Sequence, residues 1–249
     1  MERRFRHAGQ ALTQLYPMGL SLLWKAPLVL ALAMVPEFIQ HVVEIRIGLF
    51  DSSEAFRTRQ FDQTRMAAGY VKVAGFVLAV LASARFWAAR ERRQPWYRLA
   101  GIGWRRFAIG FVLFMLLPAI PALFQSRIGK SNADAAGIVA SILLLPGLFL
   151  MLAGLFGDRT TSSRDMWRRS WPWAVLMALL LVLGFVPAQW LHGKNHDWAL
   201  GGHPVLVWAL MIIDSLVVGL LAGLTGTALY LGYATFRDDM RPARTRRRA

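Results

Sequence analysis

Six long apolar stretches, separated by charged links, run along this chain and predict helices that cross a membrane. The last of them spans the 33 residues between His203 and Arg237 and contains a single charge, Asp214. A bilayer core needs about 20 apolar residues in helical form, because no backbone polar group can stay unpaired in hydrocarbon. The predicted spans are 20–43, 70–89, 107–124, 137–156, 171–191 and 205–233. We therefore expect an all-α fold, a polytopic membrane helix bundle with six transmembrane helices.

The amino-acid composition agrees with a membrane protein and argues against nucleic acid as a partner. Hydrophobic residues make up 56% of the chain and charged residues only 17%, well away from the average of soluble proteins. The net charge of +15 is interpreted as membrane orientation rather than nucleic-acid binding, because loop arginines set the topology of membrane proteins. The absence of cysteine excludes disulfides, thiolate metal sites and cysteine catalysis.

The basic residues are distributed unevenly between the two sets of links. The amino terminus, the links after the second and fourth spans and the carboxyl-terminal tail hold 20 arginines, whereas the other three links hold 7 basic residues. Cytoplasmic loops carry an excess of arginine and lysine. Both termini are therefore predicted to lie in the cytoplasm of a bacterium, with the chain in the inner membrane.

Short segments outside the spans are predicted to lie on the membrane surface. In residues 1–19, Phe5, Ala8, Leu12 and Leu15 recur at helical spacing beside cationic residues, as in an amphipathic interfacial helix. Ser162, followed by Asp165 three residues later, predicts the start of a second such helix. The organisation is thus an interfacial helix at 1–19, a transmembrane domain at 20–236 and a basic, disordered cytoplasmic tail at 237–249.

Charged groups inside the predicted spans are the best candidates for function, because charge in a bilayer is costly unless it is paired or wetted. Glu37, His41 and Glu44 fall on one helical face, and they lie in the same half of the membrane as Lys72 and Asp214. One interpretation is an intramembrane polar cluster of Glu37, His41, Lys72 and Asp214 coupled to protons or cations. Others are a polar lining for a groove, or a Lys72–Glu37 pair that fixes packing while Glu44 lies at the interface.

No metal site, cofactor or catalytic centre is predicted. His192 and His196 could hold zinc if they lay on a helix, but Gly193 and Asn195 favour a turn and spacing fixes no third ligand. The chain lacks HExxH, GxSxG and phosphate-binding glycine loops, so we expect no enzyme activity. Gly219 and Gly223 form a small-residue surface suited either to packing within the bundle or to a homodimer.

One stretch resembles a known family. The run Leu145-Pro-Gly-Leu-Phe-Leu150, followed by Asp165-Met-Trp-Arg-Arg-Ser170 and Trp173, is similar to a bacterial inner-membrane family. That family includes YciC-like proteins and the membrane domain of some glycerophosphodiester phosphodiesterases. The resemblance implies a six-helix fold in the cell envelope and no catalytic residues.

Three functions compete on these observations, and an intramembrane enzyme is the least favoured because no catalytic motif is found. The first is a non-enzymatic membrane protein that engages anionic phospholipid, or a protein partner, in envelope homeostasis. Its expected headgroup contacts are Arg105, Arg106, Arg168 and Arg169. The alternative is a small proton- or cation-coupled transporter, or a subunit of one, that uses Glu37, His41 and Asp214.

Overall fold

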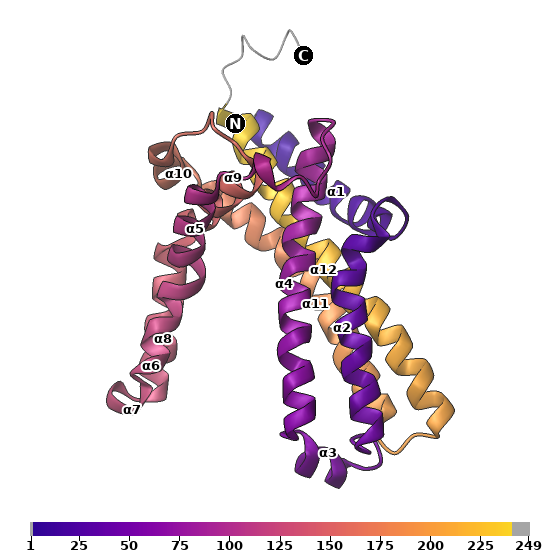
Figure 1. The fold of residues 1–249 in the computed structure, drawn as a ribbon. Coiled ribbons are helices and arrows are strands. Elements are labelled where there is room, and N and C mark those ends of the chain that lie inside the picture. The colour runs from indigo at the N-terminus through magenta and orange to yellow at the C-terminus, as the bar shows by residue number, and fades with distance from the viewer. Residues whose placement is uncertain (1, 241–249) are drawn as a thin grey trace. The chain divides into compact units, whose positions relative to one another are not determined.

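Helix is the predominant structure in the part of the chain that the structure describes. A computed structural model describes residues 2–240, with side chains from residue 5 onward, and every regular element there is a helix (Figure 1). Five helical stretches are long and apolar enough to cross a membrane, and a bent pair gives a sixth if it counts as one span. The all-α class and the presence of several such helices are therefore confirmed.

The helical stretches begin and end at different residues from those predicted. The five are α2 (Pro27–Arg46), α4 (Gln63–Glu91), the stretch Trp104–Leu123, α11 (Trp171–Ala199) and α12 (Pro204–Met240). The bent pair is α8 (Lys130–Leu143) and α9 (Leu145–Phe156), which meet at 53°. Two short helices, α3 (Ser53–Arg59) and α10 (Ser163–Arg169), lie in the links, and α10 begins as the Ser162 signal predicts.

The amino-terminal helix is longer than the sequence suggested. Helix α1 (Glu2–Lys25) continues past the predicted boundary at residue 19, and the break falls at Ala26 instead. Pro27 explains this position, because proline lacks an N–H and is favoured at the first position of a helix. At the other terminus α12 continues to Met240, so 237–240 are helical rather than disordered. The rest of the predicted tail, 241–249, lies outside the described residues.

The predicted span 107–124 is not one regular helix. An α-helix, α5 (Trp104–Phe111), gives way to the π-helical η2 (Val112–Leu116), the 3-10 helix η3 (Leu117–Ala119) and the short helix α6 (Ile120–Leu123), followed by α7 (Gln125–Ile128). Pro118 and Pro121 account for the irregular end of this stretch, because each removes a backbone donor from the ladder. Pro146 similarly lies next to the bend between α8 and α9.

Contacts divide the chain into two compact units, which we describe separately. The first comprises the residues up to 11, 88–179 and those from 229 onward; the second comprises 12–87 and 180–228. In the first unit, α5 and α9 approach through glycines: a Cβ on Gly110 would collide with the backbone of Met151, and one on Gly154 with that of Phe107. The Gly103 N–H also donates to the Gly154 carbonyl over 2.8 Å.

The second unit packs parts of α2, α4, α11 and α12 around close contacts at glycine. A Cβ on Gly75 of α4 would meet the Leu32 carbonyl, and one on Gly226 of α12 would meet the Val80 carbonyl. Gly219 lies against the side chain of Met34. Gly219 therefore serves packing within the bundle, one of the two uses that the sequence left open.

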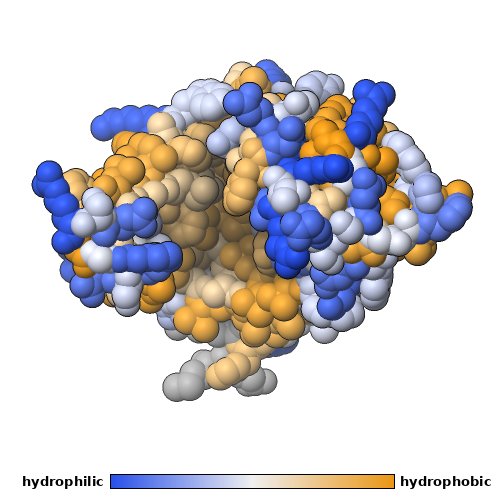
Figure 2. All heavy atoms as spheres, turned by 90° about the horizontal axis from the view of Figure 1, so that it is seen from below, coloured by the Kyte–Doolittle hydropathy of each residue, from blue (hydrophilic) through white to orange (hydrophobic). Residues whose placement is uncertain are grey.

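Large apolar side chains lie on the outside of these helices. Leu28 is 75% exposed, Leu123 79% and Val175 71%. Figure 2, viewed from the end where α3 lies, shows hydrophobic side chains exposed alongside hydrophilic ones. Such exposure is costly in water and favourable in lipid.

Candidate functional site

A buried polar centre lies in the second unit, and α2 supplies one face of it. Glu37, His41 and Glu44 follow one another at helical spacing on that face, and all three are fully buried. The His41 Nδ1 atom lies 2.9 Å from Glu44 Oε2. The Nε2 atom on the other side of the ring lies 3.0 Å from Asp214 Oδ2 and 3.3 Å from Glu37 Oε1. His41 is thus surrounded by three carboxylates.

Asp214, the single charge of the last apolar stretch, contacts side chains from two other helices, α2 and α11. It belongs to α12 and is fully buried. From α11, His192 Nδ1 lies 2.7 Å and His196 Nε2 3.4 Å from its Oδ2 atom. The Asn195 side-chain amide donates to its Oδ1 atom over 2.9 Å.

The histidines of α11 reach Asp214 because the turn that Gly193 and Asn195 suggested does not form. Helix α11 continues to Ala199, so the predicted turn is wrong. The stop signal lies farther along, where Gly201 adopts a φ of +69° and Pro204 begins the next helix. A left-handed glycine followed by proline is the usual helix ending. Gly201 and Pro204 therefore give a sequence signal that the helix runs past residue 196, which puts His192 and His196 on one helical face.

Helix α4 contributes the cations of the centre. Lys72 Nζ lies 2.8 Å from Glu37 Oε1, and Arg65 Nε lies 2.9 Å from Glu44 Oε1. The structure thus brings together the four residues of the expected cluster, Glu37, His41, Lys72 and Asp214. Glu44, which one interpretation placed at the membrane interface, is fully buried within the centre.

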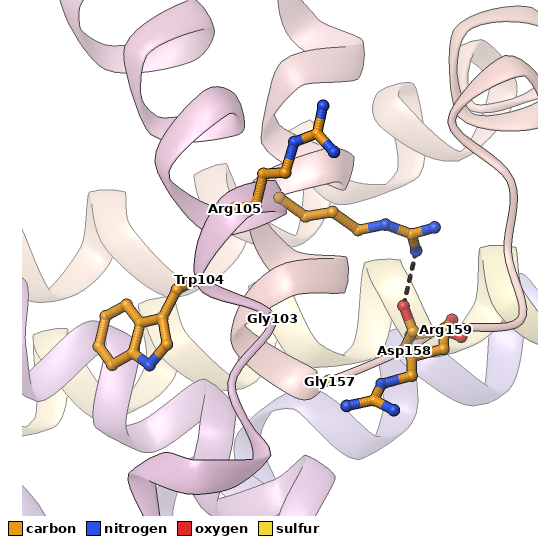
Figure 3. Close-up of a pocket in the computed structure, with 7 residues that line it drawn as sticks. Gly103, Trp104, Arg105, Gly157, Asp158 and Arg159 are labelled. Carbon is orange, nitrogen blue, oxygen red and sulfur yellow. Dashed lines mark hydrogen bonds between the residues drawn. The ribbon is translucent and has the colours of Figure 1, made fainter.

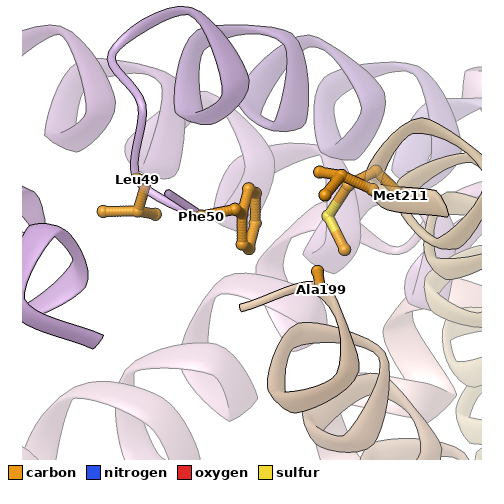
Figure 4. Close-up of a cluster of buried hydrophobic side chains, with 5 residues drawn as sticks. Leu49, Phe50, Ala199 and Met211 are labelled. Atoms are coloured by element: carbon orange, nitrogen blue, oxygen red, sulfur yellow. The ribbon is translucent and has the colours of Figure 1, made fainter. Parts of the chain in front are cut away.

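Figure 4 shows a cluster of buried apolar side chains, one of which, Phe50, lies next to His196. The cluster consists of Leu49, Phe50, Ala199, Val207 and Met211. The ring of Phe50 lies 5.7 Å from that of His196, and the Gly201 N–H donates to the Phe50 carbonyl over 2.7 Å. This cluster lowers the local polarity around the centre, and a less polar surrounding strengthens its electrostatic interactions.

The first unit holds a separate hollow of about 340 Å³ lined by arginine (Figure 3). Its lining residues are Gly103, Trp104, Arg105, Arg106, Gly157, Asp158 and Arg159. The guanidinium of Arg106 donates to the carbonyl of Asp158 over 2.7 Å and to that of Thr161 over 3.1 Å. Arg105 and Arg159 are exposed, and within residues 2–240 the structure shows no ion pair for either.

Asp158 fixes the turn on one side of this hollow. Helix α9 ends at Phe156, and the next residue, Gly157, turns the chain with a φ of +66°. The Asp158 carboxylate then accepts hydrogen bonds from the hydroxyls of Thr160, Thr161 and Tyr233. Burial alone would raise the pKa of Asp158. The bonds donated by Thr160 and Tyr233, and then by Thr161, outweigh burial and hold this pKa well below its usual range.

The four arginines expected to contact headgroups separate into two groups. Arg105 and Arg106 line the hollow together with Arg159, which the sequence did not single out. Arg168 and Arg169 lie exposed on α10 and do not line it; Arg169 Nε is 3.8 Å from Asp165 Oδ1. Only the chain reversal at Gly157 brings Arg159 to the hollow, and sequence spacing gives no direct sign of it.

These features define an all-helical protein with several helices suited to a membrane and a buried carboxylate–histidine centre. Comparison of the chain with family models, with curated proteins and with solved structures gave no match. The resemblance of the 145–173 region to the YciC-like family therefore stays a prediction.

Proposed function

We propose that this chain is a non-enzymatic inner-membrane protein, with both termini in the cytoplasm, that binds anionic phospholipid headgroups at the arginine-lined hollow. The observation that supports this function best is the gathering of Arg105, Arg106 and Arg159 around one hollow. Guanidinium groups suit phosphate because they present several N–H donors in a planar fork.

The surroundings of the hollow favour a headgroup at the membrane surface. Trp104, 54% exposed, is an interfacial anchor of the kind found where a helix enters a bilayer. Helix α5 begins at Trp104, so its first N–H groups lie beside the hollow and favour negative charge. The bonds from Arg106 to the Asp158 and Thr161 carbonyls hold the hollow in shape before a lipid arrives.

Lipid retention in nanodiscs tests this proposal. The variant carries Arg105→Gln, Arg106→Gln and Arg159→Gln, and its control carries Arg46→Gln, Arg57→Gln and Arg127→Gln, an equal change of charge outside the hollow. Each basic residue near an anionic surface contributes about 1 kcal/mol, so three predict roughly a hundredfold loss of affinity. Native mass spectrometry of protein released from phosphatidylglycerol discs measures the bound lipid. Equal retention by the two variants would contradict the proposal.

The buried centre favours a second candidate function, a small proton- or cation-coupled transporter. Three buried carboxylates and three histidines around one point are unusual in a helix bundle unless a cation binds there. Cation flux in proteoliposomes should be abolished by Glu37→Gln and kept by Glu54→Gln, a change in an exposed ion pair of α3. Equal flux in both variants would count against transport through this centre.

A further inference from the structure

We infer that the buried centre binds one divalent transition-metal ion between Glu37, His41, His196 and Asp214. This inference uses the same residues as the second candidate function, but it concerns binding alone and does not require transport. The four side chains come from α2, α11 and α12. No pair of them is adjacent in the sequence, so the site exists only once these helices have packed.

The geometry suits a small tetrahedral ion. One ligand atom from each of the four residues lies within 4.8 Å of the others. Three of the separations are much shorter: 3.0 Å between His41 Nε2 and Asp214 Oδ2, 3.3 Å between His41 Nε2 and Glu37 Oε1, and 3.4 Å between His196 Nε2 and Asp214 Oδ2. A tetrahedral site with bonds of about 2.0–2.1 Å has ligand atoms about 3.3 Å apart. Only the longer separations must shorten when the ion enters.

When both imidazoles are neutral, the lone pairs of these four ligand atoms face one another. A neutral His41 that donates from Nδ1 to Glu44 has its Nε2 lone pair facing two carboxylate oxygens. His196 Nε2 is buried and makes no hydrogen bond. Glu37, whose side chain is fully buried, also has an Oε2 atom without a hydrogen-bond partner. One divalent cation would accept lone pairs from all four residues, whereas protons would have to bind both imidazoles.

The groups around these four residues are those that support metal ligands in proteins. Glu44 accepts from the far side of the His41 ring, the carboxylate–histidine arrangement that orients a ligating imidazole. The Asn195 amide holds the Oδ1 atom of Asp214, and His192 Nδ1 lies 2.7 Å from its Oδ2 atom.

The balance of charge also leaves room for a cation. Among the described residues, the ion pairs of Glu37, Glu44 and Asp214 include two permanently charged cations, Lys72 and Arg65. With neutral histidines the centre carries one excess negative charge inside the bundle. Two imidazoles with two carboxylates suit ions of intermediate softness, such as Zn²⁺, Co²⁺ or Fe²⁺, and a chain without cysteine offers no thiolate to select a softer ion.

Binding of Zn²⁺ and Co²⁺ to the purified full chain in detergent tests the inference. The protein is stripped with chelator, titrated calorimetrically with Zn²⁺, and examined with Co²⁺ for the strong visible absorption of a four-coordinate ion. We expect one equivalent per chain and a melting temperature that rises with metal concentration. His196→Gln and Asp214→Asn should each abolish stoichiometric binding. Glu44→Gln, which keeps all four ligands, should weaken binding by about 10- to 100-fold.

His203→Ala is the matched control, because it removes an exposed histidine outside the centre and should leave binding unchanged. Metal-free melting curves and elution profiles show whether each variant is folded, and Glu44→Gln keeps the test decisive if a ligand variant does not fold. Absence of stoichiometric binding in the unaltered chain, or equal affinity in His196→Gln, would overturn the inference. Proton flux without metal binding would overturn this inference and leave the transporter proposal standing. Metal binding without flux would support this inference and count against the transporter.

Discussion

Two buried aspartates show how this chain accommodates charge at single residues. Asp214 is surrounded by imidazole and amide groups, whereas the donors to Asp158 in the described part of the chain are hydroxyls and the backbone N–H groups of Thr160 and Thr161. A buried carboxylate is stable only when such donors replace the water that it has lost. The contrast has a functional side: an imidazole can change its charge near neutral pH, whereas the hydroxyls of threonine and tyrosine stay neutral there. We therefore assign chemistry to Asp214 and a structural role to Asp158.

Asp158→Asn should destabilise the first unit by about 1–3 kcal/mol at neutral pH, because the Thr160, Thr161 and Tyr233 hydroxyls lose a charged acceptor. The pKa of Asp158 is lowered in the folded state, so its contribution is complete above the ordinary value of about 3.9. It is lost as pH falls from that value toward the folded-state pKa. The difference in melting temperature between the two proteins should stay constant from pH 8 to 5 and shrink below about pH 4.

Thermal unfolding in detergent, followed by circular dichroism, measures that difference at each pH. Thr160→Val is a useful companion, because it removes one donor and leaves the charge. A difference that is already shrinking between pH 7 and 5 would show that the hydroxyl bonds do not lower this pKa.

At the scale of helices, glycines decide which elements can touch. Gly110 of α5 and Gly103, the residue just before this helix, face Gly147 and Gly154 of α9. In each pair the two glycines are seven residues apart, about two helical turns. Close backbone approach of this kind replaces the hydrophobic effect, which gives helices little reason to associate in lipid. Gly103 and Gly157, which flank the contact between α5 and α9, also line the hollow. The candidate headgroup site therefore depends on the packing of these two helices.

Gly110→Ala should destabilise the protein by about 1–3 kcal/mol, because the new methyl group would meet the backbone of α9, which cannot move aside cheaply. Gly193→Ala is the matched control. Gly193 is a helical glycine of α11 with open space around its Cα, so alanine there should be neutral or stabilise by up to about 1 kcal/mol. Melting temperatures of the two variants in the same detergent provide the test. Equal effects would indicate that α5 and α9 are not in contact.

The elements themselves were largely predictable, and their ends were not. Hydropathy predicted the apolar helices, because a bilayer imposes about 20 apolar residues on any helical span. It predicted regular helix for 107–124, where Pro118 and Pro121 lie in a stretch of mixed π, 3-10 and α geometry. The helical face of Glu37 and His41 was predictable from spacing along one helix. The approach of His192 and His196 to Asp214 was not, because it depends on how α11 packs against α12.

At the scale of the whole molecule, the distribution of arginine is the feature that predicts function and orientation together. The same links that make one side strongly basic also contain the residues of the hollow, Arg105, Arg106 and Arg159. If cytoplasmic arginines set the topology, the hollow lies at the leaflet where anionic lipids bind basic residues most strongly. The lipid proposal and the predicted orientation therefore share one physical cause, and a test of orientation bears on both.

Single cysteines can test that orientation, because the chain has none of its own. Glu54→Cys and Lys130→Cys fall in links predicted to face outward, and Gln94→Cys and Ser163→Cys in links predicted to face the cytoplasm; all four positions are exposed. In spheroplasts, a membrane-impermeant maleimide should label the first pair directly. It should label the second pair only after permeabilisation, because the bilayer separates the reagent from cytoplasmic thiols.

The same four variants decide whether the bent pair α8 and α9 crosses the membrane. Six spans require Lys130 and Ser163 to lie on opposite sides, since the pair runs between them. A re-entrant pair would return the chain to the side it came from, so Lys130→Cys and Ser163→Cys would label alike. In that case the chain would have five spans and its two termini would lie on opposite sides of the membrane. Arg105 and Arg106, at the start of the third span, would then lie on the cytoplasmic side and Arg159, after α9, on the other side. The three arginines could not line one hollow, and the proposal of headgroup binding at the inner leaflet would fail.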